Sequence, residues 1–106
     1  GHIVQGHVDQ TARCIDVIDE NGSWRYWFEY EPNKENITVP KGSISVNGVS
    51  LTVVDSQKKR FSVAIIPYTY EVTNFHTFKP GSIVNLEFDV FGKYVARLLQ
   101  EYFSNK

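Results

Sequence analysis

The chain has 106 residues, of which 11 are Lys or Arg and 12 are Asp or Glu, so its formal net charge is -1. This length allows one domain with one core, and the balanced charge argues against nucleic acid as a partner, because phosphate binding needs a concentrated basic surface. The apolar runs are shorter than the roughly 20 residues that cross a bilayer, and the single cysteine, Cys14, allows no internal disulfide, so we expect a cytoplasmic protein without membrane contact.

The chain begins with GHIVQGHVDQ and contains no methionine, so we expect that it has lost its start residue or is part of a longer protein. His2 and His7 are five residues apart. On an extended strand such residues point to opposite faces, so these two side chains cannot share a metal ion. His76 lies far along the chain and no HxH or HxxxH spacing occurs. The sequence therefore predicts no metal site.

Two strands are predicted over residues 11–18 and 23–30, joined by the turn residues Asp-Glu-Asn-Gly. In the second strand the aromatic residues alternate with polar ones, so they occupy one face. Such a row resembles a base-stacking platform, but the alternation is what a buried face requires, and we favour the core. Trp27 lies on the other face and is the better candidate for an exposed contact. The aromatic row is Trp24, Tyr26, Phe28 and Tyr30.

The next segment, PKGSISVNGVSLTVVD, predicts a tight hairpin around Asn47-Gly48. This turn sets the register, so that one face of the hairpin is aliphatic and the other carries hydroxyl groups and one ammonium group. The predicted pairs are Val46/Val49, Ile44/Leu51 and Gly42/Val53 on the aliphatic face, and Ser45/Ser50, Ser43/Thr52 and Lys41/Val54 on the hydroxyl face. The hydroxyl face is normally solvated, but together with Lys41 it suits a polyol or a heteroaromatic ring with carbonyl groups.

A strand over residues 60–66, a helical turn with a loop over 67–81 and a last strand over 83–90 follow. In the last strand Val84, Leu86 and Phe88 are predicted to point inward, with Asn85, Glu87 and Asp89 pointing outward.

Residues 91–103 carry apolar side chains at helical spacing. About six strands followed by one amphipathic helix predict an all-β fold, a six-stranded antiparallel Greek-key barrel with a C-terminal helix. We assign residues 1–90 to the barrel and 91–106 to a helix that lies on the barrel or forms an oligomer or interdomain contact.

Catalytic residues are harder to identify from spacing alone. Ser50, His7 and Asp89 could form a triad, but no nucleophile elbow of the G-x-S-x-G type is present. Asp89 also stands just before the predicted helix, where a carboxylate commonly caps the first turn.

Four stretches in this order, GHIVQGHVD, KGSISVNGVSLTVV, FSVAIIPYTYEVTNF and KPGSIVNLEFDVFGKYVARLL, resemble the carboxyl-terminal half of riboflavin synthase. The resemblance runs from Gly1 to about Leu99. It implies a lumazine-binding barrel that follows a similar N-terminal barrel in the same protein, and a helix that assembles a homotrimer.

The resemblance also implies a reaction: two molecules of 6,7-dimethyl-8-ribityllumazine exchange a four-carbon unit to give riboflavin and 5-amino-6-ribitylamino-pyrimidinedione, without a metal or organic cofactor. Its chemistry needs loss of a proton from a ring methyl and addition of a nucleophile to the second ring. By motif position, Ser50 and Asp89 match the catalytic pair. The positions that match ligand contacts are His7, Val8, Lys41, Gly48, Thr52, Ile66 and Thr69. Tyr68 and Tyr70 depart from the family pattern beside these contacts.

Two alternatives remain open at this stage. The chain could be a lumazine or flavin carrier without catalysis, which would share the fold and most contacts. It could also be a β-barrel interaction module whose helix mediates assembly and whose ligand face is vestigial. Turnover separates the enzyme from the carrier, and flavin binding separates both from the module.

Overall fold

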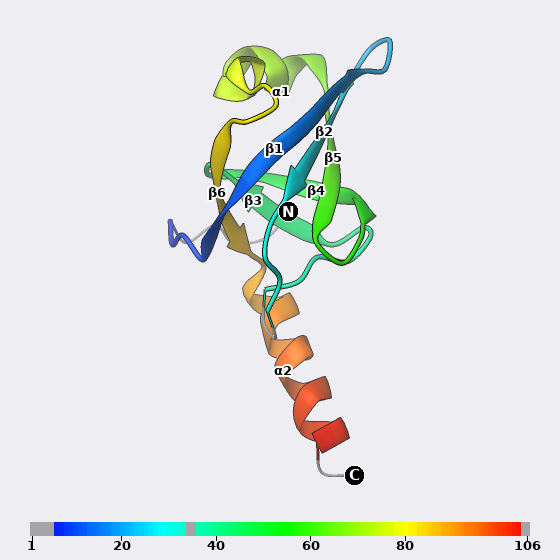
Figure 1. Cartoon of the computed structure of the whole chain (residues 1–106), viewed down its shortest axis with the longest axis vertical. Coiled ribbons are helices and arrows are strands. Elements are labelled where there is room, and N and C mark those ends of the chain that lie inside the picture. The colour runs from blue at the N-terminus through cyan, green and yellow to red at the C-terminus, as the bar shows by residue number, and fades with distance from the viewer. Residues whose placement is uncertain (1–5, 34–35, 105–106) are drawn as a thin grey trace.

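The structure is a computed structural model that describes residues 6–33 and 36–104. Six antiparallel strands close into a barrel in the order β1-β2-β5-β4-β3-β6, which is the predicted Greek-key fold (Figure 1). A short helix and a 3-10 turn connect β5 to β6, and one long helix follows β6. The elements are β1 (Gln10–Asp19), β2 (Trp24–Glu29), β3 (Ser43–Val46), β4 (Val49–Ser56), β5 (Arg60–Ile65), α1 (Pro67–Val72), η1 (Asn74–Thr77), β6 (Ile83–Phe88) and α2 (Val90–Ser104).

The tight turn between β3 and β4 forms at the predicted residues. Asn47 and Gly48 have φ angles of 47° and 82°, and positive φ at both central residues is what a type I′ turn requires. The carboxamide of Asn47 accepts a hydrogen bond of 2.7 Å from the backbone N–H of Asn85, which ties the turn to β6. The predicted register of this hairpin is confirmed from Ser43–Thr52 through Val46–Val49.

The predicted pairing of Lys41 with Val54 is wrong. Lys41 donates its backbone N–H to the carbonyl of Val53, and Val53 donates to the carbonyl of Gly42, both at 2.8 Å. Two residues therefore face one, as in a β-bulge, and the φ of 66° at Lys41 is the left-handed conformation that such a bulge uses. The bulge therefore ends the regular β3–β4 pairing before the Lys41–Val54 pair that simple alternation predicts.

The aromatic row of β2 belongs to the core, as predicted. Tyr26, Phe28 and Tyr30 are buried, and Trp24 packs against the core from its edge. The Tyr26 hydroxyl donates to the carbonyl of Phe75 at 2.8 Å, and burial raises the pKa of Tyr26 to about 12. Trp27 lies on the outer face, with the guanidinium of Arg60 5.4 Å from its ring centroid.

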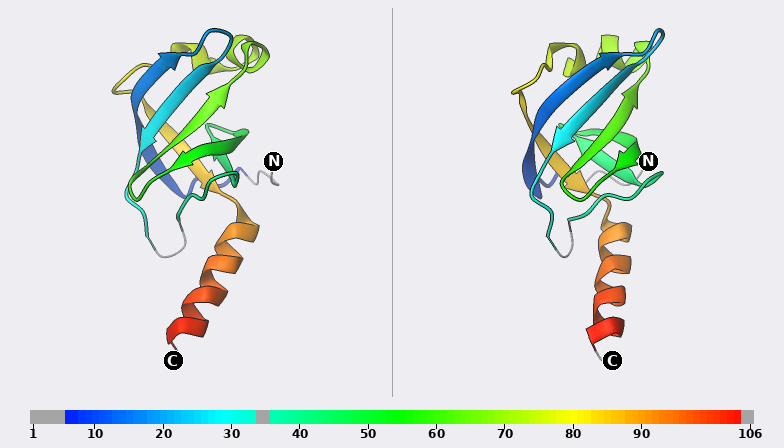
Figure 2. Two further views of the ribbon diagram at one scale, coloured as in Figure 1. Left: turned by 90° about the vertical axis from the view of Figure 1, so that its right-hand side faces the viewer. Right: turned by 45° about the vertical axis from the view of Figure 1, so that its right-hand side comes forward.

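Helix α2 extends away from the barrel along the long axis of the molecule (Figures 1 and 2). The helical periodicity predicted for this segment is confirmed, and the helix begins at Val90. Its apolar stripe is exposed in this chain, including Tyr94, Val95, Leu98, Leu99, Tyr102 and Phe103. Within the described ranges, no helix combines the length and the apolar character that a membrane crossing demands.

Candidate functional site

The hydroxyl groups predicted to lie together do so on the outer face of β3 and β4. Ser50 pairs with Ser45, Thr52 pairs with Ser43, and the Oγ atoms of Ser43 and Ser50 are 3.4 Å apart. Alternation along the two strands explains the arrangement, because Ile44 and Val46 fill the core from the opposite face. The result is a patch of closely spaced donors and acceptors on an otherwise apolar hairpin.

We call the side chains of Ser43, Ser45, Ser50 and Thr52 the hydroxyl ladder. The hydroxyl ladder continues onto β6, because β3 pairs with β6 on its other edge. Ser45 stands opposite Glu87, so Ser50, Ser45 and Glu87 form one row across three strands. Glu87 points away from the core as predicted, but the outer face is covered at this point, and only 6% of Glu87 is exposed. The segment before β1 passes over this row, and the backbone N–H of His7 donates to Glu87 Oε1 at 3.0 Å. Ser45 is buried by the same arrangement.

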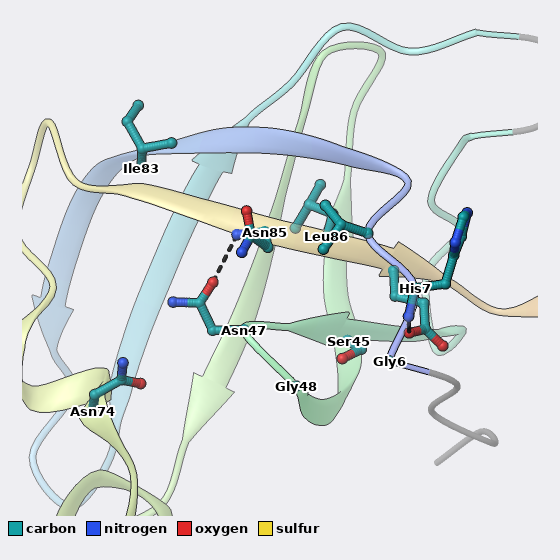
Figure 3. A pocket seen from close by; sticks show the side chains of 11 residues that line it. Gly6, His7, Ser45, Asn47, Gly48, Asn74, Ile83, Asn85 and Leu86 are labelled. Atoms are coloured by element: carbon teal, nitrogen blue, oxygen red, sulfur yellow. Dashed lines mark hydrogen bonds between the residues drawn. The ribbon is translucent and has the colours of Figure 1, made fainter.

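A cavity of about 410 Å³ opens beside this row (Figure 3). Its walls come from the segment before β1, the β3–β4 turn, the outer face of β6 and the first residue of η1. Most of the lining side chains are polar, and the Asn47–Asn85 hydrogen bond forms one wall. The lining residues are Gly6, His7, Val8, Ser45, Asn47, Gly48, Asn74, Ile83, Asn85, Leu86 and Glu87.

Three of the ligand contacts implied by the resemblance line this cavity: His7, Val8 and Gly48. His7 contributes mainly its backbone, since its ring is largely exposed and lies 3.5 Å from Asp9 Oδ1. His2 lies outside the described residues, so the expectation that His2 and His7 face opposite ways stays a prediction. In the part of the chain that the structure describes, no cluster of three His, Cys, Asp or Glu side chains could hold a metal ion.

Asp89 follows β6 directly and lines a second, smaller cavity of about 250 Å³ together with Ser43, Phe88 and the start of α2. Its carbonyl accepts the backbone N–H of Lys93 at 2.9 Å, so Asp89 occupies the position that begins the helix. Asp89 lies one residue beyond Phe88, which pairs with Ile44 at the end of the β3–β6 ladder. Ser43 connects Ser50 and Asp89, because it lies close to the Ser50 hydroxyl and shares the second cavity with Asp89.

The other implied contacts line neither of these cavities. Lys41 is exposed on the bulge, and Thr52 is exposed on β4 beyond Ser50. Ile66 occupies the position directly before α1, and 57% of it is exposed. Thr69, within α1, accepts hydrogen bonds at its carbonyl from the N–H and the hydroxyl of Thr73, at 3.1 Å and 2.6 Å.

Tyr70, one of the two departures from the family pattern, is turned toward the barrel end. Its ring stacks on that of Trp24 with 3.7 Å between centroids and 10° between planes. The stack fixes α1 on β2 and uses the Tyr70 side chain for packing. Tyr68, the other departure, is 70% exposed.

Sequence reasoning missed most of the polar lining. Asn85 and Glu87 were recognised only as outward residues of the last strand, and Asn47 only as a turn residue. Their shared wall requires β3 and β6 to be neighbours, which strand alternation does not reveal. The one available signal was the run of polar outward residues Asn85, Glu87 and Asp89 on a strand leading to a predicted site residue.

Comparisons with known proteins agree on one family. The lumazine binding domain family matches residues 5–89. Riboflavin synthase of Actinobacillus pleuropneumoniae is 43% identical over 99 residues, which are 93% of this chain and 46% of that protein. Riboflavin synthase of Bacillus subtilis (strain 168) is 38% identical over 106 residues, 100% of this chain and 49% of that protein. The chain thus spans about half the length of the curated relatives it matches.

A solved structure shares the fold. The crystal structure of LumP complexed with riboflavin has a TM-score of 0.73 and 23% sequence identity, over 81% of this chain and 47% of that one. At this identity the structural likeness is evidence for the fold alone, and the sequence matches are the evidence for the family. With a closed six-stranded barrel and a family match from residue 5 to residue 89, the chain belongs to the lumazine-binding domain family.

Proposed function

We propose that this chain binds one molecule of 6,7-dimethyl-8-ribityllumazine or riboflavin, as one half of a riboflavin synthase. The observation that carries the proposal is the polar cavity beside the hydroxyl ladder. A ribityl-substituted ring has two unlike parts, a polyol chain and a flat ring with carbonyl groups, and the cavity and the adjoining hydroxyl groups offer one polar surface for each part.

The cavity suits the ribityl chain. Each hydroxyl of a polyol donates one hydrogen bond and accepts others, and the carboxamides of Asn47, Asn74 and Asn85 offer both kinds of group. Glu87 adds a carboxylate that accepts from hydroxyl donors. The volume of about 410 Å³ lies within the range of small-molecule pockets.

The ring is assigned to the ladder above the cavity. The hydroxyls of Ser50 and Thr52 and the ammonium group of Lys41 are donors for ring carbonyls. Val8 and Ile66, both exposed apolar side chains, cover the faces of the ring. Thr69 supplies a further hydrogen bond from α1. This assignment gives a role to exposed apolar residues that otherwise face solvent.

The proposed reaction is the dismutation of two lumazines, in which a four-carbon unit leaves one molecule and completes the third ring of riboflavin on the other. Asp89 takes or returns the proton of the reacting ring methyl, and the Ser50 hydroxyl adds to the partner ring or holds the water that adds. This chain supplies one lumazine site. The second comes from another lumazine-binding barrel, as the length of the curated relatives suggests.

The exposed stripe of α2 is proposed to pack against other copies in a homotrimer. Six large apolar residues of this stripe are exposed, and a contiguous apolar face of that kind commonly marks an interface. Assembly would bring a second barrel to the ladder.

The test is a titration of the chain with 6,7-dimethyl-8-ribityllumazine, followed by the change in ligand fluorescence and by an assay for released riboflavin. The proposal expects saturable binding of one lumazine per chain. The absence of binding at high protein concentration contradicts it and favours an interaction module. Saturable binding without turnover in the complete parent protein instead favours a carrier.

A further inference from the structure

Asp9 is a buried carboxylate with two partners from distant parts of the chain. Only 6% of its side chain is exposed. Its Oδ2 accepts the backbone N–H of Phe88 at 2.7 Å, and its Oδ1 forms an ion pair with Lys93 Nζ at 2.5 Å. A buried charge is stable only when it is paired and hydrogen-bonded, so both partners are needed to hold Asp9 in place.

These partners lie on both sides of Asp89. Phe88 is the residue directly before it, and Lys93 donates its backbone N–H to the Asp89 carbonyl at 2.9 Å. Asp9 thus fixes the chain at the point where β6 ends and α2 begins, the junction visible below the barrel in Figure 1.

Asp9 also ends the segment that forms one wall of the cavity. His7 and Val8 precede it, and the His7 N–H is held by Glu87 Oε1 at 3.0 Å. The Asp9 backbone N–H donates to the Leu86 carbonyl at 2.8 Å. One side chain therefore links the cavity wall, the backbone around Asp89 and the first turn of α2.

We propose that Asp9, through its ion pair with Lys93, is a positioning residue that holds the cavity wall at residues 6–8 and the Asp89 junction as one unit. The inference rests on the proposed function for its effect on ligand binding. The coupling of Lys93 in α2 to the cavity wall rests only on the contacts of Asp9 and His7 described above, and does not depend on the proposed function. Loss of the ammonium group leaves the Asp9 charge buried with one partner fewer, which destabilises the arrangement that orders residues 6–8.

The experiment uses the chain with Asp9→Asn, Lys93→Met and both changes together. Asn keeps an oxygen for the Phe88 N–H but loses the charge, and Met keeps the length of Lys. Lys59→Met is the control, because Lys59 is exposed on the β4–β5 turn. Hydrogen exchange of the His7 amide reports the cavity wall, the Phe28 amide reports the core, and a riboflavin titration reports the site.

We expect the His7 amide to exchange about tenfold faster in either single variant, with no further change in the double variant, because the two residues act as one unit. The Phe28 amide and the control should stay at wild-type rates. Riboflavin affinity should fall by roughly fivefold to tenfold in the same variants. Should Asp9→Asn fail to fold, Lys93→Met decides alone.

Unchanged His7 exchange in Lys93→Met overturns the coupling. Faster His7 exchange with wild-type riboflavin affinity overturns the positioning role, since the wall then moves without consequence for the ligand. A wild-type chain that binds no riboflavin at all refutes the proposed function instead, and the exchange rates still decide whether Lys93 and the cavity wall are coupled.

Discussion

Glu87 offers the sharpest test of the cavity, because it is a buried carboxylate that lines it. The change Glu87→Gln keeps the shape of the side chain and an oxygen that can accept the His7 N–H, now 3.0 Å from Oε1. It removes the charge. A hydrogen bond to a charged acceptor contributes about 1.5 to 3 kcal/mol and a neutral one about 1 kcal/mol, so the His7 bond weakens by roughly 1 kcal/mol.

Two measurable effects follow from this difference. The free energy of unfolding should fall by about 1 kcal/mol, which lowers the midpoint of thermal unfolding by roughly 4 to 8 °C in a domain of this size. If ribityl hydroxyls donate to the same carboxylate, the bound state loses a similar amount again, and riboflavin affinity should fall by about fivefold to tenfold.

The assay is a fluorescence titration with riboflavin at a temperature well below the unfolding midpoint, alongside a thermal melt. Glu29→Gln is the matched control, because Glu29 is an exposed partner of Arg13 on β1 and β2, and such surface pairs contribute little. A Glu87→Gln variant that melts earlier but binds riboflavin as tightly as the wild type would refute the assignment of the ribityl chain to this cavity.

Three further changes test other parts of the account. Tyr26→Phe removes one of two donors to the Phe75 carbonyl, which still accepts the Phe78 N–H, and should cost about 1 kcal/mol. Burial raises the pKa of Tyr26 from 10.0 to about 12, so the native phenol stays protonated where the unfolded one ionises. The contribution of the protonated Tyr26 to the free energy of unfolding is complete below pH 10 and is lost as pH rises toward 12. Denaturant melts across this range should therefore show a free energy of unfolding that falls less steeply with pH for Tyr26→Phe than for the wild type. Gly48→Ala forces a side chain into φ of 82°, which should cost roughly 1 to 2 kcal/mol; an unchanged denaturant midpoint would contradict the type I′ turn. Leu98→Asp places a charge on the α2 stripe and should convert an assembly into monomers by light scattering, whereas the exposed change Glu101→Gln should not; an unchanged mass for Leu98→Asp would rule out assembly through this stripe.

Much of the barrel follows from local sequence signals. The alternation of SWRYWFEY predicts a half-buried strand because side chains of a strand point to opposite faces in turn. The pair Asn47-Gly48 fixes its hairpin register because few residues accept positive φ at two successive positions. These constraints operate within one hairpin, and the register of β3 and β4 agrees with them.

The burial of Glu87 depends instead on residues 80 positions away. The backbone of His7 covers it, and no periodicity within β6 encodes what lies over its outer face. The same holds for the cavity, whose walls come from four separate segments. The resemblance located His7, Val8 and Gly48 in this region but did not reveal the amide groups between them.

Lys41 could not be placed from the sequence for a different reason, because local backbone geometry interrupts the regular alternation there. Simple alternation extends the hairpin to a Lys41–Val54 pair, but the bulge opposite Val53 ends the ladder first. A bulge re-aims the side chain that it carries, and here that side chain is Lys41, which simple alternation places on the hydroxyl face. The period of α2 predicts its apolar stripe, and the structure leaves that stripe exposed.

The central claim is that the polar cavity receives the ribityl chain of a lumazine or flavin. Its most direct test is an NMR titration of the chain with riboflavin that follows the side-chain amide signals of asparagine. The account predicts that the signals of Asn47, Asn74 and Asn85 shift and saturate at one riboflavin per chain, while Asn21 in the distant β1–β2 turn does not move. Saturable riboflavin binding that leaves all three cavity asparagines unshifted would contradict the claim.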